Sequence, residues 1–255
     1  MCRLGRERAL KVKAAMQHTW NGYETKAWGA DELKPRSGRP QNNWGGMGMT
    51  LLDSLDVLWI MGMKEEFQRA RDWVVDNLSF AKPRSVSFFE TTIRALGGLL
   101  SAYELSKDKV FLDKAQDLGD RLLHAFKTPS GIPHGQVHLT SGRSSNPGWT
   151  GSVRYFLPGR DLVLATHVYC RVRVVRVQAS ILAEVGTVQL EFRYLSKHTG
   201  KPQYGEAAEN AIKVLKKHQK ANGLYPIYIS PQTGAVRAGT WCCKRRCCWG
   251  SCTHC

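Results

Sequence analysis

The sequence lacks the features that would place it across a membrane or among disordered chains. Its 255 residues contain no run of about 18 apolar residues, which excludes a conventional membrane-spanning helix. The first ten residues carry three arginines and no apolar core, so we do not expect a secretory signal there. Apolar residues make up 42% and charged residues 23%, which excludes wholesale disorder and favours a globular chain.

Acidic residues are scarce, since 21 Asp and Glu oppose 37 Lys and Arg and the formal net charge is +16. Three segments, 1–13, 152–179 and 235–255, each carry +4, and the other 193 residues together carry only the remaining +4. The positive charge is therefore not gathered on one helix or face, as a nucleic-acid site would require. We expect no nucleic-acid partner.

Cysteine is rare until the last fourteen residues, which hold six of the eight. Cys252 and Cys255 have the two-residue spacing of a zinc-ligand pair, but the adjacent pairs before them do not. The pattern leaves open a zinc knuckle, a disulfide knot, and a tail that folding has not shaped.

Most of the remaining sequence shows helical periodicity, with helices arranged in pairs. An amphipathic helix is expected to end near Asn21-Gly22. Thereafter one pattern occurs three times. It consists of an apolar helix, a short polar turn, and an amphipathic helix that begins with an aromatic residue. The apolar helices are expected near 48–61, 87–105 and 181–195, and their amphipathic partners near 64–78, 109–126 and 203–219. This alternation predicts an all-α fold with inner and outer helices, in which three pairs form an open arc.

Residues 152–179 interrupt this pattern. The run from Val172 to Val177 alternates valine with arginine, which is typical of a strand and not of a helix. The segment separates a loop from a helix that would otherwise follow directly, so we interpret it as an insertion.

Carboxylates within apolar helical stretches are the strongest sign of chemistry. Glu90, Glu184, Asp53 and Asp56 all lie in such stretches, where burial is costly without a role or a partner. Carboxylates that share a cavity suit the acid and base steps of glycoside cleavage. Two simpler interpretations remain open at this point: Asp53 as a charge that complements a helix N-terminus, and Arg94 as an ordinary i,i+4 partner of Glu90. The glycine-rich run 45–48 is a weak candidate for a phosphate-binding loop.

Several motifs then resemble glycoside hydrolase family 47, the class I α-1,2-mannosidases of the endoplasmic reticulum and Golgi. The motifs lie at Ala27–Pro35, Leu51–Asp56, Phe89–Tyr103, Ala183–Val185 and Gln189–Phe192. The arginine in Glu-Thr-Thr-Ile-Arg is similar to that of the endoplasmic reticulum processing branch. The resemblance covers about 6–151 and 180–234.

This resemblance implies an (α/α)7 barrel that needs Ca2+ and trims terminal α-1,2-mannose from high-mannose N-glycans with inversion. It implies that Glu90 is the acid that protonates the leaving oxygen, through a water, and that Arg94 grips the neighbouring mannose and sets the branch that is cut. Trp149 and Glu184 match positions that line the sugar cleft. The implied location is the lumen of the endoplasmic reticulum or Golgi.

The resemblance ends near Gly234. The family's later helices carry an Asp, the catalytic base and the Thr that holds Ca2+, and this sequence has no counterpart of them or of the family's membrane anchor. We therefore expect an incomplete barrel, divided into barrel residues 1–151, an insertion at 152–179, further barrel helices at 180–234 and a Cys-rich tail at 235–255. Such a chain is expected to be inactive alone. The alternative to a glycosidase is a non-catalytic glycan-binding or non-functional fragment.

Overall fold

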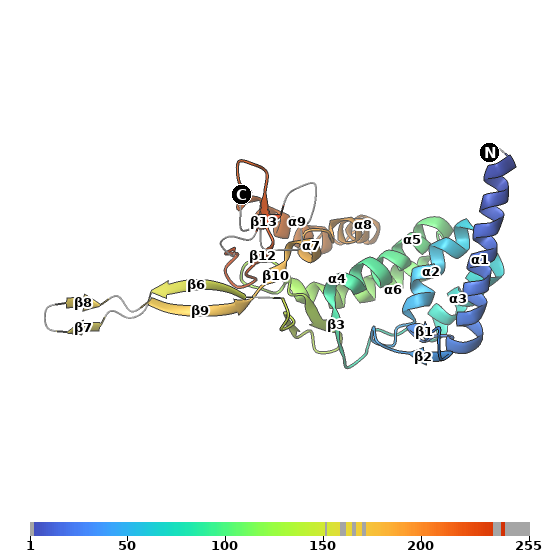
Figure 1. Ribbon diagram of the computed structural model, residues 1–255, viewed down its shortest axis with the longest axis horizontal. Helices are drawn as coiled ribbons and strands as arrows, with labels where there is room; N and C mark the ends of the chain where they lie inside the picture. Colours follow the sequence, from blue (N-terminus) through green and yellow to red (C-terminus); the bar gives the residue numbers. More distant parts are fainter. Residues whose placement is uncertain are drawn as a thin grey trace. The chain divides into compact units, whose positions relative to one another are not determined.

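A computed structural model describes residues 3–150, 152–158, 162–164, 167–169, 172–236 and 241–242 (Figure 1). The chain divides into two compact units. The first comprises Met1–Arg121 with His138–Ser141, and the second comprises Leu122–Val137 with Gly142–Cys255.

The first unit is built mainly from helices. Its elements are α1 (Arg3–Ala27), β1 (Glu32–Lys34), β2 (Arg39–Gln41), α2 (Met49–Ile60), α3 (Lys64–Asp76), β3 (Ser85–Ser87), α4 (Phe88–Thr91), the π-helical turn η1 (Thr92–Leu96), α5 (Gly97–Ser106) and α6 (Lys109–Leu122). Strands β1 and β2 form an antiparallel pair. The expected helices at 48–61, 64–78, 87–105 and 109–126 are thus present to within a few residues, the last of them ending in a 3-10 turn, η2 (Leu123–Phe126).

Helix α1 is longer than expected, because it continues through Asn21-Gly22 to Ala27. Tyr23 and Ala27 are both buried, and the Tyr23 hydroxyl donates a 2.7 Å hydrogen bond to the carbonyl oxygen of Ala30. Tertiary packing here outweighs the cost of about 1 kcal/mol for a glycine inside a helix.

Helices α2 and α5 pack backbone against backbone. A Cβ atom placed on Gly98 of α5 would lie 2.4 Å from the carbonyl oxygen of Leu52 of α2, so only glycine allows this approach. Five apolar residues of α2 are buried. Its buried residues are Met49, Leu51, Leu52, Leu55 and Leu58.

The helix pairs share a repeated contact. In each pair the aromatic residue that opens the amphipathic helix is buried, and so is the alanine three or four positions later. The residues concerned are Phe67 and Ala70, Phe111 and Ala115, and Tyr204 and Ala208. In the first unit the rings of Phe67 and Phe111 lie 5.7 Å apart, which joins two successive pairs into one core.

The second unit carries the third helix pair and most of the short strands. Its elements are η2, β4 (Gln136–His138, the last residue belonging to the first unit), β5 (Ser144–Ser145), β6 (Ser152–Pro158), β7 (Leu162–Leu164), β8 (His167–Tyr169), β9 (Val172–Gln178), β10 (Ser180–Ile181), α7 (Leu182–Val185), α8 (Gln189–Thr199), α9 (Gln203–Lys216), β11 (Tyr225–Pro226), β12 (Tyr228–Ile229) and β13 (Trp241–Cys242). Strands β6 and β9 are antiparallel neighbours from Ser152–Gln178 to Pro158–Val172. The strand expected at 172–177 is confirmed.

The single inner helix expected at 181–195 is wrong. Ser180 and Ile181 pair with Ile229 and Tyr228 in a short sheet, and the four-residue helix α7 follows before α8 begins at Gln189. Helix α7 ends at its C-cap Gly186, whose backbone N–H donates to the carbonyl oxygen of Leu182 at 2.9 Å.

No helix of the described residues combines the length and the apolar character that crossing a bilayer would need.

Candidate active site

Glu90 and Arg94 lie where a short α-helix becomes a π-helical turn. The hydroxyl of Ser87 accepts a hydrogen bond from the backbone N–H of Glu90, which starts α4. One turn later the hydroxyl of Thr92 donates to the carbonyl oxygen of Phe88 at 2.7 Å, and the wider turn η1 begins. Single π turns within α-helices occur frequently at functional sites.

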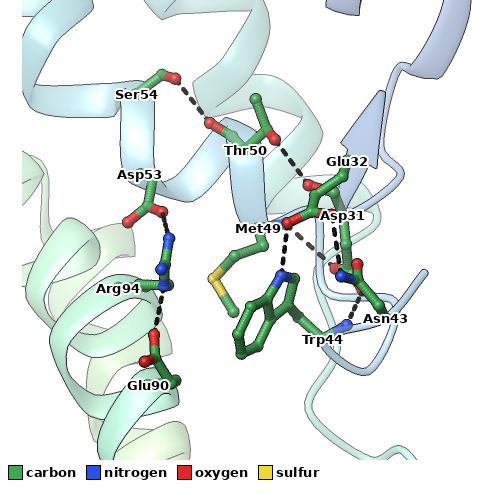
Figure 2. A network of polar contacts seen from close by, with 10 residues as sticks. All are labelled: Asp31, Glu32, Asn43, Trp44, Met49, Thr50, Asp53, Ser54, Glu90 and Arg94. Atoms are coloured by element: carbon green, nitrogen blue, oxygen red, sulfur yellow. Dashed lines mark hydrogen bonds and ion pairs between the residues drawn. The ribbon is translucent and has the colours of Figure 1, made fainter. Parts of the chain in front are cut away.

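The guanidinium of Arg94 joins two carboxylates from two helices (Figure 2). Its Nε lies 2.7 Å from Glu90 Oε2, and its Nη1 lies 3.2 Å from Asp53 Oδ2 of α2. The three side chains are about one-third exposed, so the cluster borders solvent without being freely hydrated. Arg94 is therefore an i,i+4 partner of Glu90, but it is also the link to a second carboxylate 41 positions away.

The other interpretation of Asp53 fails. Helix α2 begins at Met49 and has no acidic residue in its first turn, so Asp53 lies beyond the turn where the helix dipole acts strongly. Asp56, one turn later, accepts a hydrogen bond from the hydroxyl of Ser101 of α5 at 3.3 Å and so contributes to the α2–α5 contact.

Burial and Arg94 act on Asp53 in opposite directions. Partial burial raises the pKa of Asp53 above its ordinary value, while the hydrogen bond and positive charge of Arg94 lower it, and burial has the larger effect. The bond to Glu90 is the main cause of the raised pKa of Arg94, which keeps this side chain fully charged. Arg94 is thus a permanently charged group that lies between two carboxylates, and the surroundings of these carboxylates differ.

A buried aspartate that the sequence analysis did not single out organises the loop before α2. Asp31 has no exposed surface, and its two carboxylate oxygens accept from four backbone N–H groups at 2.7–3.2 Å. The donors belong to Trp44, Gly46, Met47 and Met49. The glycine-rich run 45–48 therefore wraps a carboxylate of its own chain, and the phosphate-loop interpretation is wrong. In the sequence, only the glycines at 45, 46 and 48 pointed to this loop. In the structure all three have positive φ angles.

Trp149 and Glu184, the two expected sugar-cleft residues, both belong to the second unit. Trp149 is 66% exposed in a turn in which Thr150 donates its N–H and its hydroxyl to the carbonyl oxygen of Pro147. Glu184 lies in α7, and its Oε2 is close enough to Gly135 that a Cβ there would be 3.3 Å away. The structure thus brings Glu90, Arg94 and Asp53 together in one unit, whereas Trp149 and Glu184 lie in the other unit.

Among the described residues, no group of three or more His, Cys, Asp or Glu side chains could hold a metal ion. No residue is therefore assigned to Ca2+, and no step below depends on it. The zinc interpretation of the tail falls on Cys252 and Cys255, outside the described residues, and so do all but Cys242 of the six cysteines of the disulfide interpretation.

Comparison with known proteins identifies relatives for almost the whole chain. The sequence model of Glycosyl hydrolase family 47 matches residues 15–251. "Mannosyl-oligosaccharide 1,2-alpha-mannosidase MNS1" of Arabidopsis thaliana is 48% identical over 226 residues, which is 89% of this chain and 36% of the relative. "Endoplasmic reticulum mannosyl-oligosaccharide 1,2-alpha-mannosidase" of Homo sapiens is 43% identical over 85% of this chain and 27% of the relative.

A solved structure shows the same fold. The alpha-1,2-mannosidase from Trichoderma reesei matches with a TM-score of 0.73 at 28% identity, over 91% of this chain and 46% of that chain. That enzyme is an (α/α)7 barrel, so the predicted helical fold class is confirmed. The chain spans about a third of the length of the curated relatives that it matches.

Proposed function

The chain belongs to glycosyl hydrolase family 47, and from this premise we propose that it carries the proton-donating side of an inverting α-1,2-mannosidase. Its substrate in this proposal is the terminal α-1,2-linked mannose of high-mannose N-glycans. We place the activity in the lumen of the endoplasmic reticulum or Golgi, because relatives are named endoplasmic reticulum mannosidases.

The observation that carries the proposal is the bond between Glu90 and Arg94. Arg94 binds Oε2 of Glu90 at 2.7 Å, and no side chain of the described residues hydrogen-bonds Oε1. In its protonated form, a fixed carboxyl group with one open oxygen can deliver its proton to the leaving oxygen of a glycosidic bond, directly or through a water, and is left as the carboxylate paired with Arg94. Arg94 holds the geometry, and its remaining N–H groups can donate to hydroxyls of the neighbouring sugar.

In the second unit, Trp149 and Glu184 each offer a kind of contact that suits a neutral, hydroxyl-rich ligand. The exposed indole of Trp149 offers an apolar face against which a sugar ring can lie. The carboxylate of Glu184 can accept hydrogen bonds from sugar hydroxyls. Calcium binding by the family remains part of the proposal for the complete enzyme, and no described residue is assigned to it.

Inversion requires a second carboxylate to activate water, at about 6.5–9.5 Å from the acid. No residue of this chain is assigned to that role. The experiment therefore uses two proteins: the 255-residue chain, and the chain joined after Gly234 to the remaining C-terminal sequence of the Arabidopsis relative. Both are incubated with a free high-mannose oligosaccharide, and binding and release of mannose are measured.

Glu90→Gln is expected to lower mannose release by the joined protein about 100-fold or more, the usual contribution of a general acid. Glu104→Gln is the matched control, since Glu104 forms a similar 2.7 Å pair with Lys107 at the solvent-exposed end of α5. Release that persists in Glu90→Gln would show that Glu90 is not the acid. Binding by the 255-residue chain without release in either protein would favour the alternative function of glycan binding.

A further inference from the structure

Hydrogen bonds hold Trp44 both at its backbone and at its indole ring. Its backbone N–H donates to Asp31 Oδ2 at 2.9 Å, and its ring Nε1 donates to Glu32 Oε1 at 2.7 Å (Figure 2). The other oxygen of Glu32 accepts from the side-chain amide of Asn43 at 2.9 Å, which holds the glutamate in turn. A ring anchored in this way cannot easily rotate away from its neighbour.

That neighbour is Arg94. The Cζ atom of Arg94 lies 5.1 Å from the centre of the Trp44 ring, within the range of a cation–π contact. Arg94 is therefore held by groups from three parts of the unit: Glu90 one turn earlier, Asp53 of α2, and Trp44 of the loop before α2. Each carboxylate accepts a hydrogen bond from a single N–H group of Arg94, whereas the ring lies against the carbon atom of the guanidinium.

We propose that Trp44 is a positioning residue for Arg94, and that it fixes the orientation in which Arg94 receives the glycan. This proposal rests on the proposed function, in which Arg94 contacts the mannose next to the scissile bond. A planar guanidinium recognises hydroxyl pairs only in a defined orientation. Rotation of the plane would change which branch of a high-mannose glycan fits.

The ring is not required to close the core beneath it. Trp44 is half-buried, while the side chains of Met47 and Met49 that follow it in the loop are buried. The loop itself is held by backbone bonds to Asp31, which persist whatever side chain occupies position 44. Loss of the ring is therefore expected to affect Arg94 more than the fold.

A double-mutant cycle tests the proposal on the 255-residue chain. The probe is a free high-mannose oligosaccharide with terminal α-1,2-mannose. Trp44→Ala is expected to weaken binding roughly 3- to 10-fold, as loss of a cation–π contact would. In an Arg94→Ala background the same substitution is expected to weaken binding less than about 2-fold. Equal effects in the two backgrounds would overturn the proposal.

Two further variants separate positioning from general destabilisation. Trp44→Phe keeps a ring but removes the donor to Glu32, so its loss of affinity is expected to be smaller than that of Trp44→Ala. Tyr103→Ala is the control, because Lys107 lies 6.0 Å from the Tyr103 ring at the other end of α5. It is expected to leave glycan affinity unchanged. A loss in Tyr103→Ala as large as that in Trp44→Ala would count against a specific role.

A measurement without glycan distinguishes failure of this inference from failure of the proposed function. The Nε–H resonance of Arg94 is followed by 15N NMR in the wild-type chain and in Trp44→Ala. Removal of the ring is expected to shift this resonance while leaving in place those of Arg69 and Arg71, which pair with Glu24 and Asp108. If the resonance shifts but the chain binds no oligosaccharide, the Trp44–Arg94 contact stands and the proposed function is rejected. An unshifted resonance would reject the contact itself.

Discussion

The side-chain amide of Asn146 hydrogen-bonds the hydroxyl of Ser180 at 3.2 Å, although 34 positions separate the two residues. The same amide nitrogen donates to the carbonyl oxygen of Gln178 at 3.0 Å, and the amide oxygen accepts from the N–H of Gly135 at 2.6 Å. Asn146 is thus a buried clamp between the chain before and the chain after the segment interpreted as an insertion. Both ends of the hairpin β6–β9 lie next to Asn146, since Ser152 pairs with Gln178, whose carbonyl oxygen Asn146 binds.

This arrangement predicts that residues 153–177 can be removed. The Cα atoms of an antiparallel pair lie about 4.5–5.5 Å apart, so an Asn-Gly turn between Ser152 and Gln178 closes the gap. Hydrogen exchange of the amides in α8 and α9 is expected to be unchanged in the shortened chain. Adding Asn146→Ala to it is expected to reduce their protection, because the buried N–H of Gly135 loses its acceptor. Loss of protection after shortening alone would show that the segment belongs to the core of the second unit.

Helix pairing could be predicted from the sequence because it depends on local periodicity. The turn residues and buried aromatic-alanine pairs repeat visibly, and Glu90 was recognisable as a carboxylate within an apolar helix. The roles of Asp31 and Trp44 could not be predicted in this way. Asp31 receives its four N–H donors from residues 13–18 positions away, and no periodicity encodes such contacts. The split of the expected helix at 181–195 likewise depends on a partner strand, β12, at a distance in the sequence.

Asp53 is expected to make stability depend on pH. Because burial raises its pKa in the folded chain, the folded state binds the proton more tightly than the unfolded state. The contribution of Asp53 to the free energy of unfolding is therefore full below the unfolded pKa and is lost as pH rises through the folded pKa. The difference in unfolding free energy between the wild-type chain and Asp53→Asn should fall over that interval.

The pKa itself is measurable by 13C NMR titration of the Asp53 carboxyl group. In Arg94→Ala it is expected to rise further, because both effects of Arg94 lower it. A lower pKa in that variant would show that Arg94 does not lower it, and a wild-type pKa below the ordinary value would show that burial is not the larger cause.

Gly98→Ala is expected to destabilise the first unit. The added Cβ would meet backbone atoms of Leu52 at 2.4 and 3.0 Å, and backbone atoms cannot move aside as a side chain does. We expect a loss of about 1–3 kcal/mol, even after the usual gain from replacing a helical glycine. Gly22→Ala is the matched control within α1, since its Cβ would meet only Leu33 Cδ2 at 3.7 Å. It is expected to stabilise by up to about 1 kcal/mol. Denaturant unfolding of both variants checks the contrast, and similar values for the two would contradict the close α2–α5 contact.

Asp31→Asn tests whether the buried carboxylate builds the loop that carries Trp44. The substitution preserves size but replaces one oxygen by an NH2 group, which faces two backbone N–H donors and cannot accept from either. Hydrogen bonds to a charged group contribute about 1.5–3 kcal/mol each, and buried donors left without an acceptor add to the cost. We expect a loss of about 3 kcal/mol in denaturant unfolding, together with a shift of the Arg94 Nε–H resonance as the Trp44 ring loses its backbone anchor.

Glu32→Gln is the control, because its amide oxygen can still accept from the Trp44 ring, and a loss below about 1 kcal/mol is expected there. If Asp31→Asn changed stability no more than Glu32→Gln, the four backbone bonds would not determine the loop. Trp44 would then be held in place by its ring alone.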